Sequence, residues 1–299
     1  MRTLHTGLEG HEALFVASQR QASHVLAFHR RHSRFLRFVD SHQKWMLMHM
    51  IADTCAGSAE GVAANWICER AQDIGIASRN TTLAFFGQLA AYGYLVRREC
   101  DSDKRMKLVA LSRETEKILG EWVGVQLAGI SPVGEITLDD DVTLRHIYLR
   151  SAGRLVGTPS YVRPPIDVGL MQDIRGGWLV MNDLLTHIDP TDCCKDSIAV
   201  SAFSIAQRAR DFAMSRSTIY RLFRLAEEAA ILGWEGEQGS DSLKMSGYHL
   251  RQYCRWNGRL LQIVCEAAQQ ANDNCRQTGT GYYFPQAAAG IRAPATRLL

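Results

Sequence analysis

Two stretches of this sequence share one pattern, and that pattern indicates the fold. Residues 78–96 read SRNTTLAFFGQLAAYGYLV, and residues 215–234 read SRSTIYRLFRLAEEAAILGW. Each opens with Ser-Arg-x-Thr, carries Phe at the ninth position, and reaches a glycine followed by an aromatic residue. Serine before an apolar periodic segment is a typical helix N-cap, so both stretches predict a helix that begins directly after the serine.

The similarity extends upstream of both stretches. ICERAQDIGIASRNT from residue 67 aligns with IAQRARDFAMSRST from residue 205 after one deletion, and Ile, Arg, Ala and Asp match in each copy. The repeated unit is a helix, a turn, a second helix and a hairpin, about 137 residues apart. Chance similarity between two amphipathic helices is the alternative, but agreement of cap, core phase and order favours a duplication.

Composition bounds the class of protein. The chain has 299 residues, of which 46% are hydrophobic and 22% charged, so it can bury a core for two domains. A net charge of +3 neither requires nor excludes nucleic acid, because a local patch matters more than the total. The sequence begins without a signal-peptide pattern and contains no apolar run of membrane-spanning length, so we expect a cytoplasmic protein with no membrane partner.

No motif predicts catalysis or a metal site. The eight cysteines include no CxxC pair, and the ten histidines include no HExxH pair. We expect the thiols to be buried, with the adjacent Cys193 and Cys194 as first candidates if any thiol senses oxidation. We therefore expect no enzyme activity, no metal and no cofactor.

The rest of the chain is predicted to be mainly helical. In the first half, helices are expected over residues 12–39, 41–55, 59–74, 78–92 and 113–129, with a hairpin in YLVRRECDSDKRMKLVALS. In the second half, helices are expected in GGWLVMNDLLTHI, in SIAVSAFSIAQRARDF, after Ser215 and over residues 247–271, with a shortened hairpin in GWEGEQGSDSLKMS. Between the halves, residues 131–164 are expected to form a connector with a short helix.

The repeated helix has two faces. Apolar spacing puts Thr82, Phe85, Phe86 and Leu89 inward in the first copy, and Ile219, Leu222, Phe223 and Ala226 inward in the second. Leu83, Ala84 and Gly87 also face outward in the first copy. A helix-turn-helix places its second helix in the DNA major groove, so the polar outward residues are candidate DNA contacts. They are Ser78, Arg79, Asn80, Thr81 and Gln88 in the first copy, and Ser215, Arg216, Ser217, Thr218, Tyr220, Arg221 and Arg224 in the second.

The two hairpins carry opposite charge. The first hairpin adds the cationic candidates Arg98, Lys104, Arg105 and Lys107, beside Arg97. The second carries Glu235, Glu237 and Asp241, opposed by Lys244. Because phosphates repel carboxylates, we expect the first half to bind DNA mainly with its hairpin and the second mainly with its helix. The alternative for each single charge is an ordinary solvated surface.

The first half resembles the MarR family of bacterial regulators over roughly residues 12–130. The resemblance rests on the pattern ending YGYLVRR, then DSDKR, then LVALS before a helix. It implies a winged helix whose Asp-x-Arg, here Asp103 to Arg105, puts the arginine into the DNA minor groove. MarR proteins are usually homodimers joined by terminal helices, and they often bind small aromatic acids, so the resemblance also implies a possible small-molecule effector.

Together these features predict tandem winged helix-turn-helix domains on a helical platform, within a mainly α fold with small β-hairpin wings. We expect a MarR-like domain over residues 1–130, the connector, a diverged winged helix over 165–272 and a flexible tail over 273–299. Such a chain is expected to be a monomer with an internal pseudo-two-fold axis, although higher assembly on DNA is possible.

Three functions follow from this organisation. The leading one is a sequence-specific regulator of transcription that binds double-stranded DNA at an asymmetric operator. The alternatives are a plasmid-type replication initiator, which also carries two winged helices, and a winged-helix module for protein interaction. An origin with repeated iterons would favour the initiator, and the neutral outer face of the first helix would suit the interaction module.

Overall fold

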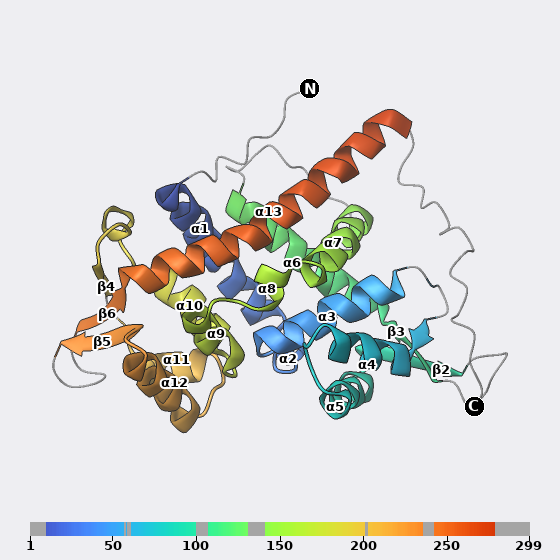
Figure 1. The fold of residues 1–299 in the computed structure, drawn as a ribbon, viewed down its shortest axis with the longest axis horizontal. Helices are drawn as coiled ribbons and strands as arrows, with labels where there is room; N and C mark the ends of the chain where they lie inside the picture. Colours follow the sequence, from blue (N-terminus) through green and yellow to red (C-terminus); the bar gives the residue numbers. More distant parts are fainter. Residues whose placement is uncertain are drawn as a thin grey trace.

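The computed structural model describes residues 10–56, 58, 61–99, 107–130, 141–200, 203–235 and 242–278. These residues form a mainly helical molecule with two small antiparallel sheets (Figure 1). Four predicted contacts or charges, Lys104, Arg105, Glu237 and Asp241, lie outside the described residues. We call residues 11–130 the first half and residues 141–278 the second half.

The first half contains six helices and a three-stranded sheet among the described residues. Its helices are α1 (His11–Arg31), α2 (Ser33–Leu36), α3 (His42–Cys55), α4 (Ala64–Asp73), α5 (Arg79–Ala91) and α6 (Arg113–Ile130). Its strands are β1 (Val62–Ala63), β2 (Leu95–Glu99) and β3 (Lys107–Leu111), in the spatial order β1-β3-β2.

The second half repeats this order, with more helices before its first strand. Its helices are α7 (Asp141–Val156), α8 (Pro159–Val162), α9 (Ile166–Asp173), α10 (Gly177–Thr186), the short 3-10 helix η1 (Pro190–Asp192), α11 (Ile205–Asp211), α12 (Arg216–Glu228) and α13 (Gly247–Thr278). Its strands are β4 (Ser197–Val200), β5 (Leu232–Glu235) and β6 (Ser242–Ser246), in the order β4-β6-β5. Strand, two helices and a hairpin therefore occur twice, with the same sheet arrangement.

The first helix of each half packs against the other half at the centre of the molecule. α1, which opens the first half, packs on α10 of the second half. Reciprocally, α7, which opens the second half, packs on α3 of the first. α6 and α13 also pack on each other and on both opening helices, and α13 runs diagonally across the molecule in Figure 1. The core is therefore continuous between the halves.

Buried polar side chains hold this centre together. The Asn257 amide on α13 donates to the Ser18 hydroxyl on α1 at 3.0 Å and to the Gln21 side chain, and Gln21 donates to Gln126 on α6. All four side chains are buried. Since a buried polar group without a partner costs free energy, these hydrogen bonds favour one relative position of α1, α6 and α13.

Most predicted elements are present, but the expected helix over residues 12–39 is wrong. Helix α1 ends at Arg31, and His32 leaves the helical region with φ −118° and ψ 29° before the short α2. The bend brings Phe35 against Tyr94, with ring centroids 5.0 Å apart, and both rings are buried. Packing of Phe35 against Tyr94 therefore favours the bend at His32 over a continuous straight helix.

The second correction concerns SIAVSAFSIAQRARDF, which we expected to be one helix. Its first four residues form strand β4, and only residues 205–211 are helical. Ile198 and Val200 are buried while Ser197 and Ala199 are exposed, which is the alternation of a half-buried strand. Pairing with β6 completes the sheet and explains the strand. Likewise, residues 62–63 of the expected helix over 59–74 form β1, and α4 begins at Ala64.

Two helices are longer than predicted. The expected short helix of the connector is α7, with 16 residues, and its Ile147, Tyr148 and Ala152 are buried between the halves. α13 continues to Thr278, beyond the expected end at residue 271, so part of the expected tail is helical. The predicted second hairpin and the cap at Ser78 are confirmed.

Candidate nucleic-acid interface

The matched helices α5 and α12 lie along the same edge of the molecule, the lower edge in Figure 1. Each is 13 residues long and begins directly after its predicted serine cap. The Ser78 hydroxyl accepts from the Thr81 amide at 3.2 Å, and the Ser215 hydroxyl accepts from the Thr218 amide at 3.1 Å. Both threonine hydroxyls also lie within hydrogen-bonding distance of the capping serine, at 2.9 and 2.7 Å. These four residues therefore shape the helix starts.

The inward faces of both helices are as predicted. Every predicted inward residue is buried, namely Thr82, Phe85, Phe86, Leu89, Ile219, Leu222, Phe223 and Ala226. Thr82 additionally donates its hydroxyl to the Ser78 carbonyl at 3.1 Å, which satisfies a polar group in the core. Burial of one face fixes which side chains of α5 and α12 are left outside.

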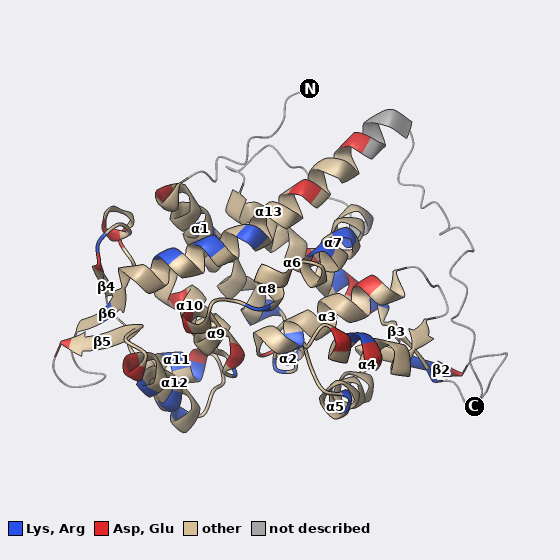
Figure 2. Ribbon diagram, viewed as in Figure 1, with Lys and Arg blue, Asp and Glu red and all other residues tan. Residues whose placement is uncertain are grey.

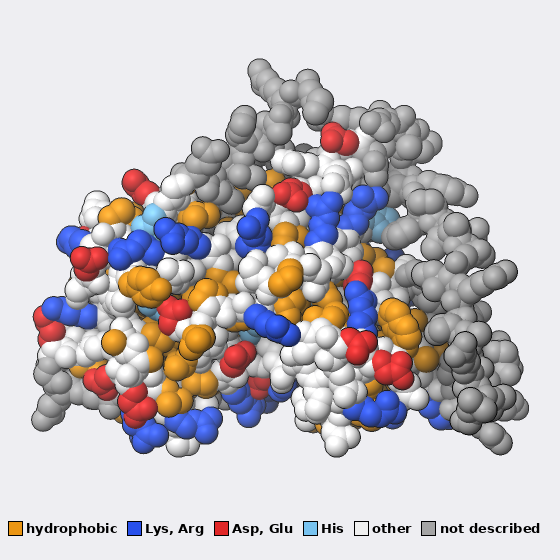
Figure 3. All heavy atoms as spheres, viewed as in Figure 1, with side chains coloured by type: hydrophobic (Ala, Val, Ile, Leu, Met, Phe, Trp, Pro, Cys, Tyr) orange, Lys and Arg blue, Asp and Glu red, His pale blue; other side chains and the backbone are white. Residues whose placement is uncertain are grey.

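The outer face of α12 is strongly cationic. Arg216, Arg221 and Arg224 are exposed on it, together with Ser217 and Tyr220. Figure 2 shows the basic residues along α12, and Figure 3 shows basic side chains along the lower edge of the surface. Arg224 lies 3.5 Å from Glu228 in an exposed pair, whereas Arg216 and Arg221 have no carboxylate partner within the described chain.

The outer face of α5 is nearly neutral. Arg79 donates to the Asn65 side chain on α4 at 2.8 Å, and Asn80 and Gln88 are exposed. Leu83 is 38% exposed, close to the 44% of Tyr220 at the matching position of α12. Apolar spacing places Leu83 on the outward face, although Leu83 is not among the candidate DNA contacts.

The first hairpin supplies the charge that α5 lacks. Arg97, Arg98 and Lys107 are exposed on β2 and β3, and Lys107 pairs with Glu99 at 3.2 Å. Arg97 lies against α5: its Nη2 atom is 4.0 Å from the point where Gly87 would carry a Cβ if it were an alanine. In the second hairpin Lys244 pairs with Glu235, which lowers the acidic excess there. The hairpin and helix of the first half thus form one surface.

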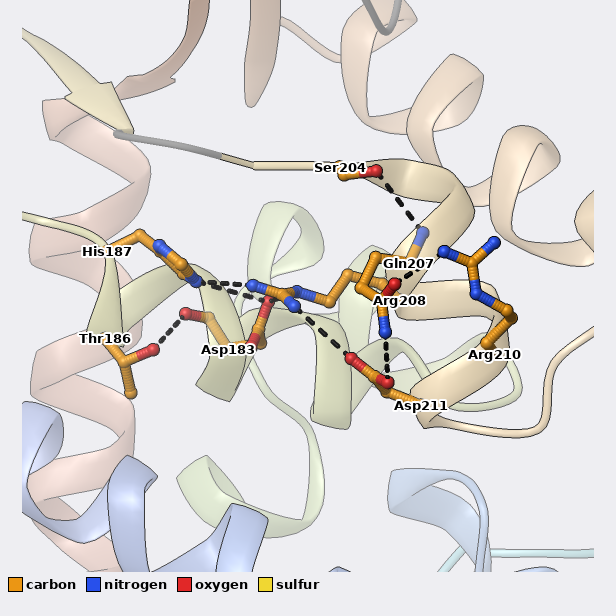
Figure 4. A network of polar contacts seen from close by, with 8 residues as sticks. All are labelled: Asp183, Thr186, His187, Ser204, Gln207, Arg208, Arg210 and Asp211. Carbon is orange, nitrogen blue, oxygen red and sulfur yellow. Dashed lines mark hydrogen bonds and ion pairs between the residues drawn. The ribbon is translucent and has the colours of Figure 1, made fainter.

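Behind α12, a buried ion pair fixes α11 on α10 (Figure 4). The Arg208 guanidinium donates to the Asp183 carboxylate, to Asp211 at 3.3 Å and to His187 at 2.6 Å. Burial raises the pKa of Asp183, while Arg208 and His187 oppose that shift. The pair joins α10 to α11, the first helix of the repeated unit. Because α12 packs on α11, the pair also helps to position α12.

The first half contains the same link. Arg70 on α4 donates to the Asp53 carboxylate at 2.6 Å and to the Thr54 hydroxyl at 2.9 Å. Arg70 and Arg208 are the matched arginines of the repeat. Their retention in both copies was a sequence signal for this contact, but the partner aspartates lie outside the aligned stretch. Sequence reasoning therefore missed both pairs.

A hollow of about 610 Å³ lies between α3, α9 and the turn that follows α4. Met46, Gly75 and Arg163 contribute to its lining, and Arg163 donates to the Ile74 carbonyl at 3.3 Å. The hollow is where a small-molecule effector would have room, and an effector stays a prediction.

The six cysteines whose side chains the structure describes give little support to redox sensing. Cys68, Cys193, Cys254 and Cys265 are buried, Cys55 is half-buried and Cys194 is exposed. The Cys193 and Cys194 sulfurs are 3.7 Å apart, and burial raises the pKa of the Cys193 thiol to about 11. Because the thiolate is the reactive form, Cys193 is a poor nucleophile at neutral pH.

Within the described parts of the chain, no group of three or more His, Cys, Asp or Glu side chains is placed to hold a metal ion. None of the helices in those parts has the length and apolarity that crossing a bilayer requires. Comparison of the chain with protein-family models, curated proteins and solved structures finds no match. Function is therefore inferred from the geometry of the two matched helices and their hairpins.

Proposed function

We propose that this chain is a sequence-specific regulator of transcription that binds double-stranded DNA as a single-chain pseudo-dimer. The observation that carries the proposal is the presentation of α5 and α12 along one edge, each with its apolar face buried and its N-terminal end exposed. In this reading each repeated unit is a winged helix-turn-helix, and β2–β3 and β5–β6 are its wings.

Electrostatics favours the same ligand. Arg216 and Arg221 stand on the exposed side of α12 without carboxylate partners among the described residues, and a guanidinium binds guanine edges or phosphates well. Arg97 and Lys107 give the first hairpin the charge to bind a DNA backbone.

The reciprocal packing of α1 on α10 and α7 on α3 supports the pseudo-dimer. Two DNA-binding units that share a core must meet one face of a duplex together. Half-sites are then expected about one helical turn apart, or a multiple of it. Because the outer faces of α5 and α12 differ, the operator is expected to lack strict symmetry.

The test is a titration of fluorescent duplexes selected from a random library by the full chain. Arg216→Ala and Arg221→Ala should each weaken binding by about 1–3 kcal/mol and relax base preference at one position. Glu227→Ala, an exposed change at the far end of α12, is the matched control and should bind like the parent. Parent-like binding by both folded arginine variants would contradict the proposal and favour a protein-interaction module.

A further inference from the structure

The two matched helices present different chemistry at equivalent positions. With the serine caps aligned, Leu83 takes the place of Tyr220, and Ala84 takes the place of Arg221. All four side chains are exposed. Similarly, Gly87 stands where α12 has Arg224. The outer face of α5 is therefore apolar at the positions where the face of α12 is aromatic or cationic.

This apolar strip lies on the basic side of the first half. Leu83, Phe86 and Val109 help to line a hollow of about 570 Å³ between α5, the start of α4 and the hairpin, and Arg97 and Lys107 also line it. The cation on α5 itself, Arg79, is held by Asn65. Positive charge thus flanks the helix, where a DNA backbone would pass, while the exposed surface of α5 beyond Arg79 is uncharged.

The DNA major groove offers a ligand for such a surface. Thymine presents an apolar C5-methyl group there, adenine presents an edge that pairs with Asn or Gln, and guanine presents two acceptors that suit Arg. Leu83 and Ala84 match the methyl group, and the exposed amides of Asn80 and Gln88 match adenine. On α12, Arg216 and Arg221 match guanine instead. Arg216 has a counterpart in Arg79, which donates to Asn65 on α4, whereas Ala84 stands at the place of Arg221, so Arg221 makes the main difference.

We propose that the two helices read chemically different half-sites: α5 reads an A·T-rich half-site through thymine methyl groups against Leu83 and Ala84, and α12 reads guanine edges through Arg216 and Arg221. This inference rests on the proposed function. It goes further by naming the bases in each half of the operator and the residues that select them.

Base analogues test the inference one atom group at a time. In a selected duplex, the half-site whose preference changes with Arg221→Ala is assigned to α12, and the other to α5. Deoxyuridine then replaces thymine in the α5 half-site, which removes only the methyl group. Loss of one buried methyl should weaken binding by about fourfold, whereas the same replacement in the α12 half-site should have no effect. 7-Deazaguanine in the α12 half-site should weaken binding by at least about fivefold.

A double-mutant cycle links the methyl group to its partner. Leu83→Ala should weaken binding to the thymine duplex and leave little further loss on replacement by deoxyuridine. Leu83 is partly exposed, so this variant is expected to fold, and circular dichroism checks that it does. Ala84→Arg copies the residue type at Arg221 and should shift the preference of the α5 half-site toward guanine.

The outcomes separate the two proposals. Equal binding of thymine and deoxyuridine duplexes by the parent would overturn the inference while DNA binding stands. Equal loss for Leu83→Ala on both duplexes would overturn it as well, because Leu83 would then act without the methyl group. Failure to bind any duplex in the library would instead overturn the proposed function itself.

Discussion

At the scale of single residues, two alanines adopt backbone angles that favour glycine. Ala213 has φ 50° and Ala230 has φ 54°, and the matching positions of the first half hold Gly75 and Gly93, with φ 76° and 77°. A left-handed conformation costs a residue with a Cβ about 1–2 kcal/mol. Each turn of the second half is therefore strained where its counterpart in the first half is not.

We predict that Ala230→Gly raises the free energy of unfolding by about 0.5–1 kcal/mol, because relief of strain exceeds the added entropy of the unfolded chain. The reverse change, Gly93→Ala, should lower it by about 1 kcal/mol, since a Cβ there meets no neighbouring atom and only the backbone angle matters. Urea denaturation of both variants measures the difference. Destabilisation by Ala230→Gly would contradict the strain.

The Arg208–Asp183 pair leads to a prediction that depends on burial. Only 15% of the Arg208 side chain and 8% of the Asp183 side chain are exposed, against 27% for both members of the Arg70–Asp53 pair. Arg208→Met should leave an uncompensated buried carboxylate and cost about 3 kcal/mol, whereas Arg70→Met should cost about 1 kcal/mol. The double variant Arg208→Met/Asp183→Leu should recover much of the loss, because no buried charge remains. Denaturation curves of the four proteins decide it, and an unrecovered double variant would contradict this account.

At the scale of elements, α3 predicts how stability depends on pH. Burial lowers the pKa of His42 to about 4 and that of His49 to about 3, from an ordinary value of 6.5. The unfolded chain then takes up protons near pH 6.5 while the folded chain does not, so stability falls as pH drops from about 6.5 toward 4. The loss should reach several kcal/mol over that window.

We expect His49→Gln to flatten this dependence, because glutamine does not titrate and can replace the ring nitrogen that faces the Tyr148 hydroxyl at 2.9 Å. Urea denaturation at pH 7 and pH 5 compares the parent with this variant. His24→Gln, at an exposed position of α1, is the matched control and should retain the parent's slope. If the free energy of unfolding of His49→Gln depended on pH as steeply as that of the parent, His49 would not be a source of this pH dependence.

The elements also show why some structure could be predicted from sequence and some could not. α5 and α12 were predictable because an N-cap, an apolar period and a stop signal all lie within one short segment. β4 was not, because Ser197–Val200 becomes a strand only by pairing with β6, more than forty residues later in the sequence. The burial of α7 likewise depends on helices from both halves.

Some features of the candidate interface could also be predicted from the sequence, and others depend on packing. Periodicity alone gave the outward faces of α5 and α12. The contact of Arg79 with Asn65 and the approach of Arg97 to Gly87 depend on how α4 and β2 pack against α5, so no local pattern could reveal them.

At the scale of the whole molecule, the packing of the first helix of each half on the other half predicts a monomer. The surfaces that would join two subunits of a dimer are already buried between the halves, with α1 on α10 and α7 on α3. Light scattering at micromolar concentration should give the mass of one chain. A stable dimer without DNA would contradict the pseudo-dimer.

The same core should fix the distance between the two half-sites. α6 and α13 pack directly on each other, and buried hydrogen bonds tie Asn257 to Ser18 and Gln21 across the centre. Insertion of about 5 bp between half-sites turns one of them to the opposite face of the duplex, and about 10 bp restores the face but adds roughly 34 Å. A shared rigid core can follow neither change, so we predict that both insertions reduce affinity to that of a single half-site. Electrophoretic mobility shifts with the parent spacing, the two insertions and an isolated half-site measure it. Recovery of affinity with the 10 bp insertion would mean that the two halves move apart on DNA, and the continuous core would then not set the operator.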